Sequence, residues 1–134
     1  MTKKEYAISL HDKKFNCCQS VACAFADELG IDEKILFQAG EAFGLGMGCE
    51  LGTCGAITGA VLLAGFKNSD GNLVAPGTKA ETYALSKEIL NQFLSKNGSL
   101  VCQELRGTLT NTPLRSCAGC IEDGVEIAAN VLKL

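Results

Sequence analysis

The eight cysteines of this 134-residue chain are the side chains best suited to carry chemistry. They are Cys17, Cys18, Cys23, Cys49, Cys54, Cys102, Cys117 and Cys120. The first fourteen residues have no apolar core and no small-residue cleavage site, so we expect a cytoplasmic protein. Structural disulfides are rare in a reducing compartment, and a dense cysteine set there favours metal binding or redox work. Free cysteine is also a common small core residue, and we expect that role for about half of them.

Three cysteines directly follow a residue of a type that caps helices. The pairs are Asn16-Cys17, Thr53-Cys54 and Ser116-Cys117. Each cysteine would then lie on the first turn of a helix, where unpaired N–H groups and the helix dipole favour negative charge. Such a setting lowers the pKa of a thiol and makes it a better nucleophile and metal ligand. The alternative is that cysteine follows the cap only because that turn is buried.

The sequence C-A-G-C from Cys117 to Cys120 is a C-x-x-C pair at an expected helix start. This spacing is typical of thiol–disulfide proteins and also of half a metal site. No strand precedes it, which disfavours a thioredoxin-like fold, and Ile121 stands where haem attachment needs histidine. Cys49 and Cys54 enclose four residues of a glycine-rich loop and could face the same space. The irregular spacing of these pairs disfavours a zinc finger.

Several other classes of function are disfavoured by composition. The net charge is −3 and no basic cluster is present, so we expect no nucleic-acid partner. The longest uncharged run, residues 51–66, is shorter than the roughly 20 residues that span a bilayer, so we expect no membrane insertion. The single histidine, His11, stands among Asp12 and two lysines and is expected on the surface. A cysteine–histidine hydrolase is therefore disfavoured.

Apolar periodicity and capping residues predict an all-α fold, a single compact bundle of about five or six helices over residues 1–134. Helices are expected over residues 3–14, 17–29, 32–43, 54–64, 78–97 and 117–132. Gly30 stands where glycine ends the second of these helices. Residues 44–52 are expected to form a loop whose glycines let it fold tightly.

The bundle is expected to be organised around the stretch from Phe43 to Phe66. Small residues behind Cys54, among them Gly55, Ala56 and Gly59, would let its helix approach neighbouring helices closely. That helix has so few polar positions that a second copy of the chain could cover part of it, and a homodimer is therefore one outcome that this face allows.

The chain resembles the C_GCAxxG_C_C family of redox-active proteins, named for four cysteines around a C-G-A-x-x-G motif. The motif here is C-G-A-I-T-G, from Cys54 to Gly59, and N-C-x-Q-x-V begins at Asn16. The resemblance matches the four family cysteines to Cys17, Cys54, Cys102 and Cys120. It implies a small helical protein with a redox role, and a related domain in certain cytochromes suggests that four cysteines ligate a cluster. The extra cysteines, above all Cys117 and Cys49, could substitute for one of the four.

Two functional hypotheses follow. In the first, Cys17, Cys54, Cys102 and Cys120 hold an iron–sulfur or other metal–thiolate centre that transfers electrons to a redox partner protein. In the second, the protein is a metal-free thiol–disulfide protein or sensor, in which Cys117 and Cys120 cycle or Cys54 pairs with another cysteine. A structural module with inert buried cysteines is a third reading, and a structural zinc site a fourth.

Overall fold

The computed structural model describes all 134 residues, which form helices joined by short connections. In chain order these are α1 (Lys3–Asp12), α2 (Cys17–Cys23), α3 (Ala26–Leu29), α4 (Glu33–Gly40), the 3₁₀ helix η1 (Glu41–Phe43), α5 (Gly44–Gly48), α6 (Gly55–Asn68), α7 (Lys79–Asn97), α8 (Cys102–Arg106) and α9 (Cys117–Leu132). The only strand-like contact is an isolated bridge between Thr53 and Val101. The predicted all-α class is confirmed. The short helices α3, α5, α8 and η1 take the number above the predicted five or six.

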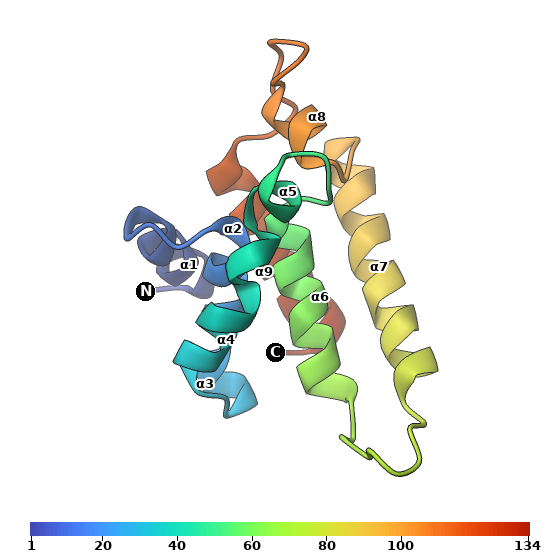
Figure 1. Ribbon diagram of the computed structural model, residues 1–134. Coiled ribbons are helices and arrows are strands. Elements are labelled where there is room, and N and C mark those ends of the chain that lie inside the picture. Colours follow the sequence, from blue (N-terminus) through green and yellow to red (C-terminus); the bar gives the residue numbers. More distant parts are fainter.

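Helix α6 lies at the centre of the bundle (Figure 1). Figure 1 shows α7 running beside it, α9 behind it, and α2 and α4 on the side away from α7. Ile57 and Leu63 of α6 are fully buried, and they belong to one apolar core with Phe25, Phe93 and Ile121. Burial of such side chains is the main stabilising contribution to a domain of this size. The apolar stretch predicted to organise the fold therefore does so.

Two glycines bring the helices that carry cysteines into close contact. A Cβ atom at Gly59 of α6 would lie 2.7 Å from the backbone oxygen of Cys18 in α2. A Cβ atom at Gly124 of α9 would lie 2.8 Å from the backbone oxygen of Ala56 in α6. Only a residue without a side chain allows these approaches. The close packing predicted from the small residues of α6 is confirmed.

The predicted single helix over residues 17–29 is wrong, because α2 ends at Cys23 and α3 begins at Ala26. Phe25, between them, leaves helical geometry with φ −109° and ψ 14°. The break lets Phe25 enter the main core while Cys23 and Ala26 enter a second, smaller core with Leu36. Gly30 ends α3 in a left-handed conformation with φ 64°, as predicted.

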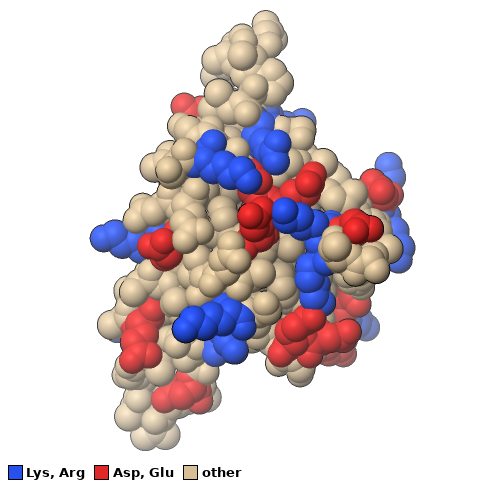
Figure 2. Space-filling model, turned by 180° about the vertical axis from the view of Figure 1, so that it is seen from behind, with Lys and Arg blue, Asp and Glu red and all other residues tan.

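Charged side chains of both signs are mixed over the face of the molecule shown in Figure 2. No basic patch of the kind that nucleic-acid-binding proteins carry stands out on this face. None of the helices has the length and apolar character required to cross a lipid bilayer.

Candidate redox site

Five of the eight cysteines line one cavity of about 160 Å³. They are Cys17, Cys54, Cys102, Cys117 and Cys120. The cavity lies where α2, α8 and α9 begin, beside the first residues of α6. The structure therefore brings together the four predicted ligands and also Cys117, which was predicted as a substitute. Cys49, the other predicted substitute, is exposed and does not line the cavity.

Side-chain caps position Cys17 and Cys117, as the sequence predicted. The Asn16 side chain accepts a hydrogen bond from the Gln19 amide at 2.9 Å, and the Gln19 side chain accepts one from the Asn16 amide at 2.9 Å. The Ser116 hydroxyl accepts a hydrogen bond from the Gly119 amide at 3.0 Å. These caps fix the two helix starts, so both thiols are held on a first turn.

The prediction that Thr53 caps the next helix is wrong, because Cys54 itself occupies the N-cap position of α6. Thr53 instead forms the bridge to Val101. In that short antiparallel contact the Cys54 amide donates to Leu100 at 2.8 Å, and the Cys102 amide donates to Gly52 at 3.0 Å. The contact places Cys54 and Cys102 side by side at the cavity.

The glycine-rich segment before Cys54 is not a plain loop but includes one left-handed turn, α5. Leu45, Gly46 and Met47 have φ angles of 54°, 56° and 66°. Left-handed geometry costs a residue with a side chain roughly 1–2 kcal/mol, so this turn is held by its surroundings. A Cβ atom at Gly46 would lie 2.4 Å from the Cβ atom of Cys102. The turn therefore packs directly against one of the cavity cysteines.

Cys17 and Cys117 are neighbouring thiols whose pKa values shift in opposite directions. The hydrogen bond from Cys17, helped by the nearby charges of Arg106 and His11, lowers the pKa of Cys117 to about 6. Donation to Cys117, together with burial, raises the pKa of Cys17 above its ordinary value. Cys117 is therefore the more acidic thiol of the two and the more nucleophilic at neutral pH.

Cys54 and Cys120 form a second pair of the same kind. The hydrogen bond from Cys120, with the amides of Ala56 and Ile57 at the start of α6, lowers the pKa of Cys54 against the opposing effect of burial. Donation to Cys54, together with burial, raises the pKa of Cys120. Both thiols are buried, with exposed fractions of 5% for Cys54 and 2% for Cys120. This pair lies deeper than Cys17 and Cys117, which are half-buried.

The lowered thiol pKa predicted at three helix starts is thus correct for Cys54 and Cys117 and wrong for Cys17. All three lie at a helix start, but only one thiol of each contacting pair can accept the shared hydrogen bond. Cys102 belongs to neither pair, and burial, followed by the charge of Cys54, raises the pKa of Cys102 to about 11.

The remaining cysteines take ordinary roles. Cys18 and Cys23 are buried away from the cavity, and Cys23 belongs to the smaller apolar core, so two of the eight cysteines take the core role expected for about half of them. Burial raises the pKa of Cys18 to about 11 and, with the charge of Glu33, that of Cys23 to about 12. Such thiols are poor nucleophiles at neutral pH.

Three side chains around the cavity were not found from the sequence. His11 was predicted to lie on the surface, but it is half-buried, lines the cavity and bonds the Phe15 carbonyl oxygen through Nδ1 at 3.0 Å. Arg106 and Arg115 also line the cavity. Their positions depend on how α1, α8 and α9 meet, and no local pattern in the sequence signals that meeting.

Four thiolates are the ligand set of common iron–sulfur clusters, and the donor set at this cavity fits such a group. As the side chains stand, no three histidine, cysteine, aspartate or glutamate residues converge on a position for one metal ion. The thiols converge in two pairs instead. In a two-iron cluster each iron takes two protein ligands, so paired cysteines suit that arrangement better than a single-ion site.

Comparisons with known proteins give one match. No curated protein matches the chain, and no solved structure does. A family model described as "Putative redox-active protein (C_GCAxxG_C_C)" matches residues 15–131, a span that includes all eight cysteines. The chain therefore belongs to the C_GCAxxG_C_C family of redox-active proteins.

Proposed function

We propose that the chain is an electron-transfer protein whose cavity cysteines hold an iron–sulfur cluster. The observation that carries the proposal is the convergence of five thiols, from four different helix starts, on one cavity of about 160 Å³. Membership of a redox-active family supports a redox role for these thiols. The cluster, when bound, would supply one-electron chemistry that no side chain of this protein provides.

The contacting pairs suggest which cysteines are the ligands. Cys17 with Cys117 and Cys54 with Cys120 supply four sulfurs in two pairs, as two irons require. Cys102 lines the same cavity outside both pairs. This ligand set differs from the one predicted from the sequence, since it exchanges Cys102 for Cys117.

Helix N-termini and arginine side chains around the cavity stabilise negatively charged sulfur. The N-termini of α2, α6 and α9 face the site and favour thiolate over thiol. Arg106 and Arg115 add positive charge at its edge. Leu45 and Leu105 cover part of the cavity with apolar surface, which limits access of water. Hydrogen bonds and positive charge near cluster sulfurs raise the reduction potential.

Anaerobic purification followed by iron and sulfide analysis tests this proposal. We expect about two irons and about two sulfides per chain, with visible absorbance that decreases on reduction. Cys54→Ser and Cys117→Ser should each lose the cluster, whereas Cys49→Ser should keep it. A colourless and metal-free protein after anaerobic reconstitution would contradict the proposal.

A metal-free thiol–disulfide function is the second candidate, and the opposite pKa shifts within each pair favour it. Cys117 and Cys54 are the thiols with the lowered pKa, which makes them the better nucleophiles of each pair. In each pair, two thiols would become one disulfide, and two electrons and two protons would pass to an external disulfide that is reduced to two thiols. Cys17 and Cys120 would serve as the second sulfur of each bond.

Thiol counting by mass spectrometry separates this candidate from the cluster. After mild oxidation with a small-molecule disulfide, the metal-free protein should lose four free thiols in two reversible steps. Tryptic mapping should then connect Cys17 to Cys117 and Cys54 to Cys120. If no pair oxidises reversibly, the thiol–disulfide candidate fails.

We also propose that a second copy of the chain covers the open face of α6. A groove of about 480 Å³ along α6 is lined by Phe43, Met47, Val61 and Leu90, among others, and no charged side chain reaches it. Phe43 and Met47 are 37% and 46% exposed. Light scattering should show a dimer that Val61→Lys converts to a monomer, and a wild type that is monomeric at every concentration would contradict this.

A further inference from the structure

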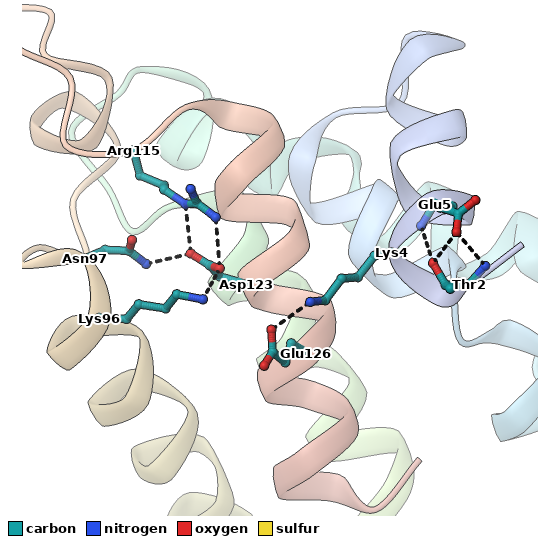
Figure 3. A network of polar contacts seen from close by, with 8 residues as sticks. All are labelled: Thr2, Lys4, Glu5, Lys96, Asn97, Arg115, Asp123 and Glu126. Carbon is teal, nitrogen blue, oxygen red and sulfur yellow. Dashed lines mark hydrogen bonds and ion pairs between the residues drawn. The ribbon is translucent and has the colours of Figure 1, made fainter.

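The buried carboxylate of Asp123 is the centre of a polar network (Figure 3), and one member of this network, Arg115, also lines the cysteine cavity. Asp123 is 2% exposed, and its two oxygens accept hydrogen bonds from three side chains. Lys96 lies 2.7 Å from Oδ1, and Asn97 lies 3.1 Å from Oδ2. Arg115 binds both oxygens, through Nε at 3.1 Å and Nη2 at 3.3 Å. The network therefore connects the end of α7, the segment before α9, and α9 itself.

The geometry of Arg115 explains the glycine of C-A-G-C. A Cβ atom at Gly119 would lie 2.5 Å from Arg115 Nε and 2.6 Å from its Cζ. The guanidinium thus crosses the first turn of α9 at the one residue without a side chain, and it lines the cysteine cavity on the way to Asp123. The Gly119 amide is also the donor to the Ser116 cap.

The segment before α9 is held at a second point. The amides of Leu114 and Arg115 donate to the carbonyl oxygen of Leu105 in α8, at 2.9 Å and 3.3 Å. Cys102, at the start of α8, and Cys117, at the start of α9, are therefore joined through this segment. Release of Arg115 would free the side of the segment that leads directly into Cys117.

We propose that Asp123 is a positioning residue for the cysteine site, which acts through Arg115 on the turn that carries Cys117 and Cys120. The inference rests on the proposed redox function of that site. A buried carboxylate that loses its cationic partners is strongly unfavourable, so Arg115 cannot leave this position at low cost. The network sets the distance of Cys117 and Cys120 from Cys17 and Cys54, the partners contributed by α2 and α6.

Alkylation of the metal-free, fully reduced protein tests the inference without using redox activity. Cys120 is 2% exposed, and mass spectrometry can follow its reaction with iodoacetamide separately from that of the other cysteines. We expect Asp123→Asn to increase the rate at Cys120 by at least about tenfold, because local opening of this turn becomes easier. Glu126→Gln is the matched control, because Glu126 lies on the same helix as Asp123. This substitution breaks the exposed ion pair between Glu126 and Lys4 of α1 (Figure 3) and should leave the rate at Cys120 unchanged.

Gly119→Ala provides a second variant in case Asp123→Asn does not fold. It changes no charge, and it should raise the rate at Cys120 by displacing the Arg115 guanidinium. In an Arg115→Ala background the same substitution should have no effect on the rate, because the obstructing side chain is gone. Additive effects of the two substitutions would contradict the proposed contact.

A second readout separates positioning from stability. Ile127→Val, a core change on the same helix, should lower the melting temperature without changing the midpoint potential of the site. Asp123→Asn should shift that potential. If Asp123→Asn only lowers the melting temperature, and leaves both the potential and the Cys120 rate unchanged, the positioning role is wrong. If the rates change as expected in a protein without redox activity, the positioning holds and the proposed function fails.

Discussion

Alanine should stabilise the protein at Gly65 but not at Gly59, although both glycines lie in α6. The intrinsic helix propensity of alanine favours each substitution by about 1 kcal/mol. A Cβ atom at Gly65 meets no atom within 4 Å, so that gain should remain. A Cβ atom at Gly59 would lie 2.7 Å from the backbone oxygen of Cys18 and 3.0 Å from the Cβ atom of Val21. Neither atom is the flexible end of a side chain, so α2 and α6 must move apart.

The expected magnitude follows from these contacts. Overpacking of a well-packed core costs about 1–3 kcal/mol, which offsets or exceeds the propensity gain at Gly59. The free energy of unfolding of the two variants should therefore differ by about 1–3 kcal/mol, with Gly65→Ala the more stable. For a chain of this size that difference corresponds to about 4–10 °C in melting temperature.

Urea unfolding of the fully reduced protein, followed by far-ultraviolet circular dichroism, measures the difference. The slope of the free energy against urea should be the same in both variants, so that the midpoints can be compared directly. The Gly59 variant should also weaken the site, because α2 carries Cys17 and Cys54 caps α6. If both alanine variants gain the same stability, α2 and α6 do not make this contact and the reasoning about the site is refuted.

Three further predictions concern the cysteines, the first two of them in the metal-free, reduced protein. Iodoacetamide at pH 7 should modify Cys117 before Cys102, because the pKa of Cys117 is about 6 and that of Cys102 is about 11. Arg106→Leu should slow the reaction at Cys117, since the charge of Arg106 helps to lower the pKa of this thiol. Equal rates at both cysteines would contradict this prediction. The free energy of unfolding should fall between about pH 9 and pH 11. Burial raises the pKa of Cys18 to about 11 in the folded protein, whereas this thiol has its ordinary pKa of 9.0 in the unfolded chain. The unfolded chain therefore loses the proton first as the pH rises, which favours unfolding. Urea midpoints across this range should fall less steeply in Cys18→Ala, and an unchanged slope would count against the buried thiol as a cause. Cys49→Ser should leave the iron content and the thiol count of the other cysteines unchanged, since Cys49 is exposed and outside the cavity.

The sequence was sufficient for the fold class and for the helix starts that carry Cys17 and Cys117. Asn16 and Ser116 signal their helix starts locally, through side chains that bond amides three residues ahead, and both were found. The small residues of α6 signalled close packing for the same local reason. These features need no knowledge of how distant segments meet.

The features that sequence reasoning missed depend on tertiary contacts. Cys54 became the cap because Thr53 pairs with Val101, far along the chain, and two bridged residues leave no alternating pattern to read. The break between α2 and α3 arises because neighbouring residues are buried in different cores: Phe25 lies in the main core, and Cys23 and Ala26 lie in the smaller one. Cys117 looked like a substitute ligand, since nothing in the sequence shows that its thiol contacts Cys17.

A reversible redox titration of the anaerobically purified protein tests the central claim most directly. If Cys17, Cys54, Cys117 and Cys120 hold one cluster as a single redox centre, the wild type and Cys49→Ser should show the same reversible transition in visible absorbance. That transition should be lost in both Cys17→Ser and Cys54→Ser. A wild type with no reversible transition, or a transition that survives in both of these variants, would contradict the account.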